Sequence, residues 1–415
     1  MIQMGFHKWV SKKSLFRHSE RRFCEAKNLP LKVKVISLSL DMVNNRAFRT
    51  APAMTLILTL TILFCVPASS QTTKAPFKRL KTKHGYIVPL PLIVYSPETH
   101  FGLGLSGQYL FRFKNDSLSN LSTTGSTILY TLEKQFIVNP NWDFYFRENK
   151  WRTGGALVYQ KFPESFWGIG NSTGNEEKEK FTAKYILFRN RATRQMAKHF
   201  HLGLQYRVEY AYDFKTDTAG VLHDNAIRGS SGYRQSGAGV AAVYDSRDNS
   251  MFPFKGWLVV FSNHFYPRWL GSEYEFANFK VDARKYFNPF TSNVIAVQAL
   301  LSFHAGEPPF KMLSLLGGTE TMRGYYMGRY RDKHLFAAQA EWRFPIWWRF
   351  VGAAFYGVGD VTRNFKDLSW GSLKHSIGGG LRFTLDSSER INVRFDAAFG
   401  TDGSRGFYFQ VGEAF

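Results

Sequence analysis

Three groups of side chains have residue types and spacings that could carry chemistry. Ser262, His264 and Asp282 supply the components of a hydrolytic triad and fall on adjacent predicted strands. Nothing around Ser262 resembles the sharp turn that exposes a nucleophile in such enzymes. His199 and His201 lie two residues apart, but no Asp, Glu or Cys completes a metal site with them. We therefore expect no catalytic residue and no bound metal.

The third group is the glycine-rich segment GLGLSG at residues 102–107. Its spacing fits a nucleotide-binding loop, but it lies inside a strand pattern and opens no helix that could hold a pyrophosphate. The net charge of +22 could indicate nucleic acid. The lysines and arginines are scattered through strands and turns, which favours contacts with lipid phosphates or simple solubility. We expect no cofactor and no nucleic-acid partner.

The elements that must position these residues show a period of two. In residues 391–399 the odd positions are apolar, and 392, 394 and 396 are polar. Residues 204–210 and 336–344 also alternate, with the even positions apolar. One face of each strand therefore meets an apolar medium and the other a polar one. Long alternating strands with aromatic ends are typical of a transmembrane barrel, where closure of the sheet pairs every backbone group. The mean hydropathy is slightly negative, which excludes a helical membrane protein.

Sixteen such segments can be counted, which predicts an all-β, 16-stranded antiparallel transmembrane β-barrel closed on itself. The pattern leaves fourteen or eighteen strands open. The predicted strands are 85–97, 101–113, 121–132, 134–147, 151–163, 181–196, 199–214, 233–246, 256–267, 274–288, 292–306, 334–346, 350–361, 373–386, 391–400 and 405–415.

The N-terminal part has a different composition. Residues 54–66, MTLILTLTILFCV, are too short for an ordinary membrane helix but suit the apolar region of a signal peptide. We expect residues 1–70 to be a leader that is cleaved near Ser70 and Gln71, with a retained anchor as the alternative. Cys24 and Cys65, the two cysteines, would leave with it.

Three parts of the chain follow from this organisation: the leader 1–70, a short periplasmic segment 71–84, and an outer-membrane barrel 85–415. A signal peptide followed by a barrel predicts location in the outer membrane of a Gram-negative-type bacterium.

One long loop then gives a family resemblance. The stretch at residues 315–346, LLGGTETMRGYYMGRYRDKHLFAAQAEWRFPI, resembles the sixth surface loop and following strand of the BamA/TamA family of outer-membrane assembly barrels, of the bacterial surface antigen type. In that family the loop carries an Arg-Gly-Tyr or Arg-Gly-Phe core after two glycines and folds into the lumen. The resemblance implies that Arg323 pairs with an acidic side chain of the twelfth to fourteenth strands. Asp360 is the first expected partner and Glu341 the second.

The resemblance assigns a lumenal latch to this loop. Its core would be Arg323, Gly324 and Tyr325, and a guanidinium can hold a carboxylate with two hydrogen bonds. Gly317, Gly318 and Gly324 would let the backbone pass close to the barrel wall.

Two further stretches carry the resemblance to particular residues. YDSRDNSMFPFKGW at residues 244–257 resembles the family's turn between the eighth and ninth strands, and its motif residues are Asp245, Arg247, Asp248, Pro253 and Gly256. GFYFQVGEAF at residues 406–415 resembles the closing strand. The resemblance implies an insertion signal there, made of the outward set Phe407, Phe409 and Val411 together with the terminal Phe415.

The implied function is to assist insertion or translocation of proteins at the outer membrane without covalent chemistry. Such barrels close their first and last strands weakly, so that a client strand can pair with the exposed edge. The expected partners are outer-membrane lipid and lipopolysaccharide, unfolded outer-membrane clients, and a separate periplasmic receptor, because we expect no POTRA domain in this chain. The alternatives are a passive or regulated pore and, further away, a lumenal lipid-modifying enzyme.

Overall fold

The computed structural model describes residues 80–82, 85–113, 116, 118–218, 220–224, 226–387 and 390–415. The predicted leader, its cleavage site and both cysteines lie outside these residues. Among the residues described, no helix is long and apolar enough to cross a membrane.

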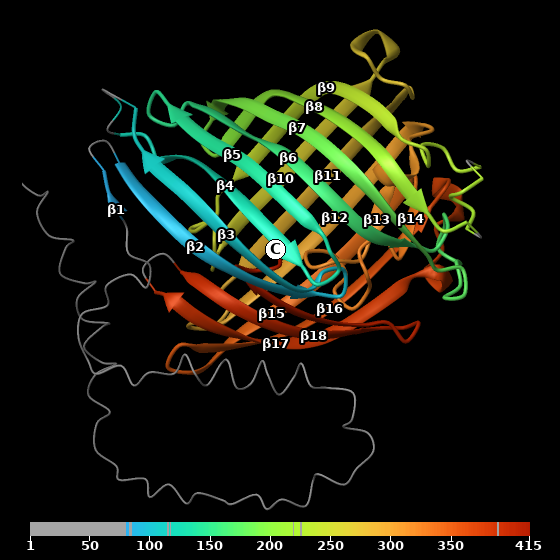
Figure 1. Cartoon of the computed structure of the whole chain (residues 1–415). Helices are drawn as coiled ribbons and strands as arrows, with labels where there is room; N and C mark the ends of the chain where they lie inside the picture. The colour runs from blue at the N-terminus through green and yellow to red at the C-terminus, as the bar shows by residue number, and fades with distance from the viewer. Residues whose placement is uncertain are drawn as a thin grey trace, which may run out of the picture. The chain divides into compact units, whose positions relative to one another are not determined.

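Sixteen antiparallel strands follow one another around a closed sheet, as predicted (Figure 1). They are β2 (Gly85–Ser96), β3 (His100–Phe111), β4 (Ser122–Thr131), β5 (Phe136–Phe146), β6 (Trp151–Phe166), β7 (Glu179–Ala197), β8 (Phe200–Thr216), β9 (Tyr233–Asp245), β10 (Gly256–Tyr266), β11 (Phe276–Phe287), β12 (Val294–Gly306), β15 (His334–Trp347), β16 (Phe350–Thr362), β17 (Lys374–Asp386), β18 (Ile391–Gly400) and β19 (Arg405–Val411).

The strand ends lie within three residues of the predicted ones, with one exception. The last strand ends at Val411, and not at the predicted Phe415. A two-residue strand, β1 (Leu80–Lys81), also precedes the barrel and pairs with the start of β2. The final residues therefore leave the sheet instead of extending its last strand.

Alternation explains why these segments form a barrel. Along β12, Val294, Ala296 and Gln298 are buried while Ile295 and Val297 are exposed. The exposed set faces outward, where a bilayer would cover it, and the buried set faces the lumen. The lumenal face includes many polar side chains, as expected for a barrel whose interior holds water and loops.

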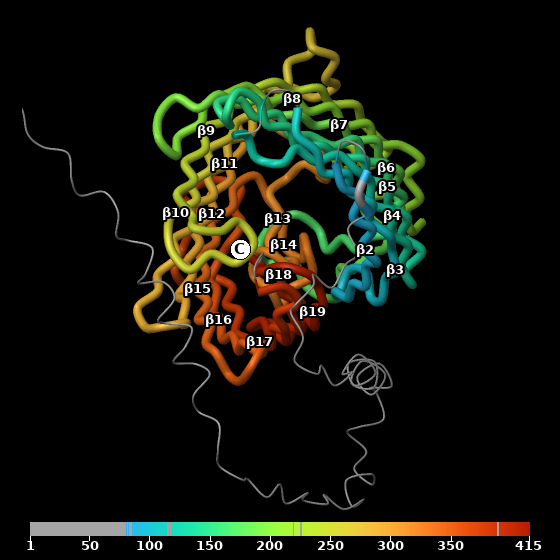
Figure 2. Tube along the Cα trace, turned by 90° about the vertical axis from the view of Figure 1, so that its left-hand side faces the viewer, coloured from blue at the N-terminus to red at the C-terminus, as the bar shows by residue number. Residues whose placement is uncertain are grey.

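The sixth loop, residues 307–333 between β12 and β15, folds into the lumen (Figure 2). It contains the 3-10 turn η4 (Phe310–Met312) and a small hairpin of β13 (Ser314–Leu316) and β14 (Tyr330–Asp332). Three further 3-10 turns lie in other loops: η3 (Arg268–Leu270), η5 (Phe365–Asp367) and η6 (Trp370–Ser372). The inward fold of the loop, implied by the family resemblance, is therefore observed.

The sixth loop does not fill the lumen. A cavity of about 1670 Å³ lies between the loop and the inner faces of the strands from β5 to β12. The lumen thus has one part packed by the loop and one part open to water.

Candidate functional site

Arg323 lies fully buried between the sixth loop and the barrel wall. Its Nη2 donates to Glu341 Oε2 at 2.5 Å, and its Nη1 donates to Asp396 Oδ2 at 2.6 Å. The guanidinium carbon lies 3.5 Å from the ring centroid of Phe355. Ion pairing at the two terminal nitrogens and stacking on the ring fix the guanidinium in one orientation.

Arg323 belongs to a larger set of buried charges, which we call the arginine network. Its members are Arg323, Arg343, Arg382, Arg394, Glu341, Asp396 and Glu413, and each is joined to another by an ion pair. Four guanidinium groups therefore face three carboxylates. The side chains of these residues are at most 3% exposed. The network links the loop to β15, β17 and β18 and to the residues after β19.

Burial makes this network sensitive to the loss of any member. Removing one partner of a buried ion pair leaves a charge without compensation, which typically costs about 3–5 kcal/mol. A wet, exposed pair is worth only about 0–1 kcal/mol. Because the side chains of Arg323, Glu341 and Asp396 are fully buried, their ion pairs belong to the buried kind.

Backbone contacts reinforce the position of the loop core. Tyr408 Oη accepts from the Gly324 amide at 2.8 Å, and Ser376 Oγ donates to the Arg323 carbonyl at 2.5 Å. Tyr325 Oη donates to the His375 carbonyl at 2.7 Å. The loop core is therefore bonded to β17 and β19 as well as through its charge.

The expected partner Asp360 is wrong. Asp360 is buried in β16, but its carboxylate accepts from Asn171 Nδ2 and from Ser372 Oγ, which belong to two neighbouring surface loops. The second expected partner, Glu341, does bind Arg323. The other partner, Asp396, lies on β18, outside the three strands that the resemblance implied.

Only one of the three loop glycines approaches the wall. A Cβ on Gly324 would lie 3.0 Å from the Phe399 backbone of β18, and Gly324 has a φ of 109°. Gly317 instead faces the returning limb of the loop, where a Cβ would meet the Tyr326 carbonyl at 2.2 Å. Gly318 faces Met327. These two glycines shape the loop itself.

The junction of the first and last strands, which we call the seam, is the weakest part of the sheet. β2 and β19 share one registered pair, Tyr95 with Phe409. Every other neighbouring pair of barrel strands shares six or more. Nearer its start, β2 is paired on this side by β1 at Tyr86 and Ile87. Most of the seam edge of β2 therefore lacks a partner strand.

The C-terminal residues turn away from the seam and into the lumen. Gly412 has a φ of 90°, and after it Glu413 Oε2 accepts from Arg382 Nε at 3.2 Å. The Phe415 oxygen accepts from Arg343 Nη2 at 2.8 Å, and the Phe415 ring packs in the cluster of Tyr286. The predicted extension of the last strand to Phe415 is therefore wrong, because the arginine network holds this end inside.

The other three residues of the expected insertion signal lie on the outward face of β19. Phe407 and Val411 are exposed, and Phe409 shares their face by alternation. Phe407 stacks on Phe395 of the preceding strand.

The turn between β9 and β10 has the geometry that its motif suggested. Asp245 accepts two hydrogen bonds from Arg247, at 2.9 and 2.8 Å. Asp248 accepts from the amides of residues 254 and 255 and from Arg390 of another turn at 2.6 Å. Burial opposes ionisation of Asp248, but these hydrogen bonds hold its pKa below the ordinary value.

The remaining motif residues close the same turn. Pro253 is buried in it. Gly256 has a φ of 112°, and a Cβ there would meet the Ser246 carbonyl at 2.3 Å. A side chain at position 256 is therefore excluded by backbone conformation and by space.

The three residues of the possible hydrolytic triad have different surroundings in the structure. Ser262 and His264 line the cavity, while Asp282 binds Arg284 and Gln298. In the described part of the chain, no group of three or more His, Cys, Asp or Glu residues is arranged to hold a metal ion.

Comparison with known proteins identifies the family to which this barrel belongs. A model of the Omp85 superfamily domain matches residues 114–415. The barrel is similar to the crystal structure of BamA from Haemophilus ducreyi lacking POTRA domains 1-3, with a TM-score of 0.54 and 14% identity over 82% of this chain and 75% of that one. Among curated proteins, none matches this sequence.

Two further structures share the fold. CdiB from Acinetobacter baumannii has a TM-score of 0.52 and 8% identity, over 80% of this chain and 60% of that chain. CdiB from Escherichia coli has a TM-score of 0.53 and 9% identity, over 80% and 63%. The chain thus spans less than two thirds of either CdiB chain, and such identities show the fold alone. Because the family model matches well over half of the sequence, this chain belongs to the Omp85 superfamily, whose outer-membrane barrels are transport and assembly proteins and not enzymes.

Proposed function

We propose that this barrel assists the insertion or translocation of proteins at the outer membrane, and that the seam is where a client strand engages it. The observation that carries the proposal is the single registered pair between β2 and β19. An unpaired strand edge offers backbone donors and acceptors to another chain. A client strand that pairs there would bring fewer unsatisfied backbone groups into the lipid, where each costs several kcal/mol.

The proline residues of β2 favour transient pairing. Pro89 and Pro91 both lie in β2 and pair in register with β3. Residues two apart direct their backbone groups to the same side, and proline within a sheet is found where its missing N–H faces an unpaired edge. The seam edge would then offer carbonyls at these positions but no N–H groups. A client strand would be held by fewer hydrogen bonds and released more readily.

The arginine network supplies a fixed wall beside the seam. Glu413, which follows β19, is bound to Arg382 and Arg343, while Arg323 ties the loop to Glu341, which binds the same two arginines. This arrangement holds the end of the chain inside the lumen, where it cannot extend β19 along β2. The network thereby keeps the seam edge free.

The partners of this activity would be unfolded outer-membrane proteins and the surrounding lipid, with lipopolysaccharide in the outer leaflet. A separate periplasmic receptor would gather the clients. Export by the N-terminal signal peptide belongs to the same proposal.

A reversible covalent lock on the seam tests the proposal. The described residues contain no cysteine, so that Tyr95→Cys with Phe409→Cys would create the only thiol pair in the barrel. The oxidised variant in liposomes should slow the assisted insertion of an unfolded barrel client, and reduction should restore the rate. The readout is the heat-dependent gel shift of the folded client over time.

The control places the same cross-link where the ladder is complete. Leu103→Cys with Tyr130→Cys joins β3 and β4 at an exposed, registered pair. This variant should insert clients at the same rate oxidised or reduced. Equal rates for the oxidised and reduced seam variant would remove the seam from the mechanism.

The open cavity supports the alternative of a pore. Its volume of about 1670 Å³ and its polar lining suit the passage of water and small solutes. A pore would show steady single-channel conductance in planar bilayers and no effect on client insertion. An assembly barrel with the loop in place should speed insertion whatever its conductance.

A further inference from the structure

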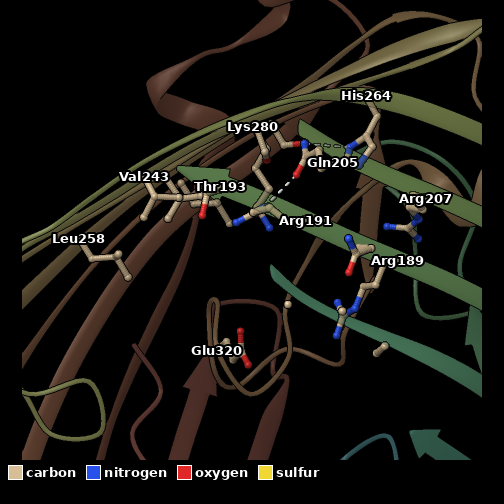
Figure 3. A pocket seen from close by; sticks show the side chains of 18 of the residues that line it. Arg189, Arg191, Thr193, Gln205, Arg207, Val243, Leu258, His264, Lys280 and Glu320 are labelled. Atoms are coloured by element: carbon tan, nitrogen blue, oxygen red, sulfur yellow. Dashed lines mark hydrogen bonds between the residues drawn. The ribbon is translucent and has the colours of Figure 1, made fainter. Parts of the chain in front are cut away.

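Four arginines gather on the lumenal face of three consecutive strands. Arg152 lies on β6, Arg189 and Arg191 on β7, and Arg207 on β8, and all four line the cavity (Figure 3 shows the last three). Arg189 and Arg207 are registered partners directly opposite each other. Like charges in that relation destabilise a sheet pair. The sequence therefore keeps an unfavourable juxtaposition that an anion would relieve.

Two of these arginines have no carboxylate partner. Arg152 is held by Asp143 through two hydrogen bonds of 2.8 Å, and Arg207 is paired with Glu209. In the described part of the chain, Arg189 and Arg191 form no ion pair. Arg191 donates only to the neutral Gln205 amide oxygen, at 3.1 and 3.0 Å.

Arg207 also retains binding capacity. Its Nε is buried and lacks a hydrogen-bond partner among the described residues. Arg189 is exposed, and its guanidinium makes no hydrogen bond or ion pair to a described residue, so that its N–H donors are available to a ligand. Guanidinium groups in this state match the geometry of oxyanions, which accept two hydrogen bonds from one arginine.

The tip of the sixth loop holds an acidic side chain near this cluster. Glu320 is exposed and lines the same cavity as Arg189 (Figure 3). Its backbone is fixed, since the Glu320 carbonyl accepts from Gln339 at 2.6 Å. Its carboxylate forms no hydrogen bond or ion pair within the described residues. Glu320 therefore places an unpaired carboxylate in the same cavity as the arginines.

We infer that Arg189, Arg191 and Arg207 form a lumenal binding site for an oxyanion of the phosphate class, with Glu320 as its built-in competitor. The ligand would be a free phosphate ion or the phosphate of a lipid headgroup. A bound anion would offset the positive charge of Arg189, which lies opposite Arg207, and would compete with the Glu320 carboxylate for it. The site lies on the open side of the lumen, away from the arginine network and from the seam, and does not depend on the proposed function.

The test is titration of the folded chain in zwitterionic detergent with inorganic phosphate and with pyrophosphate, measured by calorimetry. Arg189→Gln with Arg191→Gln should weaken binding by about tenfold or more, as expected for the loss of charge-assisted hydrogen bonds. Glu320→Gln should tighten binding by about two- to fivefold, the scale of an exposed charge interaction. A purely structural role of these residues would not predict opposite directions.

The control is Arg194→Gln. Arg194 lies on the same strand, β7, but is absent from the cavity lining and places its guanidinium over the Trp151 ring. Affinity for phosphate should be unchanged in this variant. A heat-dependent gel shift shows which variants fold, and if the double arginine variant does not, Glu320→Gln alone decides the outcome.

A second arm separates the two sources of phosphate. Nanodiscs of phosphatidylcholine with and without phosphatidic acid are analysed by native mass spectrometry for lipid retained by the barrel. Free phosphate binding identifies a soluble ion; selective retention of phosphatidic acid, lost in the double arginine variant, identifies a headgroup. The inference is overturned if neither binds, if Arg194→Gln weakens binding as much as the double variant, or if Glu320→Gln does not tighten it.

Discussion

The two ends of the barrel sheet meet at the seam, yet the wall on one side of it is held far more strongly than the seam itself. From β15 to β18 each strand shares ten or more registered pairs with the next, and buried ion pairs tie the sixth loop to them. Between β2 and β19 there is one pair. The contrast shows that buried charges reinforce the wall from β15 to β18, whereas in the described part of the chain no ion pair of the arginine network crosses the seam to β2.

Breaking the arginine network should have the largest effect. Arg323→Ala should destabilise the folded barrel by about 3–5 kcal/mol, because Glu341 and Asp396 would lose a buried cation. Arg323→Lys should recover only part of this, since an ammonium keeps the charge but lacks the planar fork. The measurements are urea unfolding in lipid vesicles and hydroxyl-radical footprinting of Tyr325.

A double-mutant cycle sharpens that result. Arg323→Ala combined with Asp396→Asn should cost less than the sum of the single changes, because the two residues are in contact. Asp360→Asn is the matched control, since Asp360 is as buried but binds other loops. Additivity with Asp396, or coupling with Asp360, would contradict the observed pairing.

The residue shared by both regions should have the next largest effect. Glu413→Gln weakens the bonds to Arg382 and Arg343 that hold the chain end inside, at a cost of about 1.5–3 kcal/mol for a hydrogen bond to a charged group. The freed end should then extend β19 along β2. Cysteines at positions 93 and 411, which would face each other if the ladder continued from the pair of Tyr95 and Phe409, should cross-link in this variant and not in the parent; a cross-link in both would show that the end is not held.

Restoring donors at the seam should have a smaller effect. Pro89→Val with Pro91→Val would return two N–H groups to the seam edge, each worth about 0.5–1.5 kcal/mol when paired. We expect slower release of a bound client strand, measured as the dwell time of a fluorescent client peptide. Unchanged dwell time would mean that the prolines face β3 and not the seam.

The smallest effect should come from pH at the outer end of the loop. Burial opposes ionisation of Asp402, but hydrogen bonds from Ser404 and Tyr330 and the charge of Arg329 hold its pKa below the ordinary value. A lowered folded pKa means that this contribution is present above about pH 4 and is lost as the pH falls through the folded pKa. Footprinting of Tyr330 should rise between pH 5 and pH 2.5, and Asp402→Asn should remove that step.

The sequence could predict the barrel because its signal is local. Alternation along each strand fixes which side chains face inward, and it placed Glu341, Arg394 and Asp396 on the lumenal face. Partner choice depends instead on which height of the wall the loop reaches. The resemblance limited the expected partner to the twelfth to fourteenth strands, whereas Asp396 lies on the fifteenth, β18.

The end of the chain was misassigned for a similar reason. Phe415 has the same parity as Phe407, Phe409 and Val411, which favours one strand through all of them, but Glu413 interrupts the apolar series. Gly412 and the bond from Arg343 to the Phe415 oxygen override that pattern. The arginine that makes this bond lies 72 residues away, so that only the folded structure brings the two together.

Amide hydrogen exchange of the whole chain in nanodiscs tests the contrast between the two regions most directly. Peptides covering β2 should exchange much faster than peptides covering β16, because exchange reports local opening and the seam edge of β2 lacks a partner strand. The Glu413→Gln variant should slow exchange in β2 as β19 extends along it. Protection of β2 equal to that of β16 in the parent chain would contradict a weak seam beside a fixed wall.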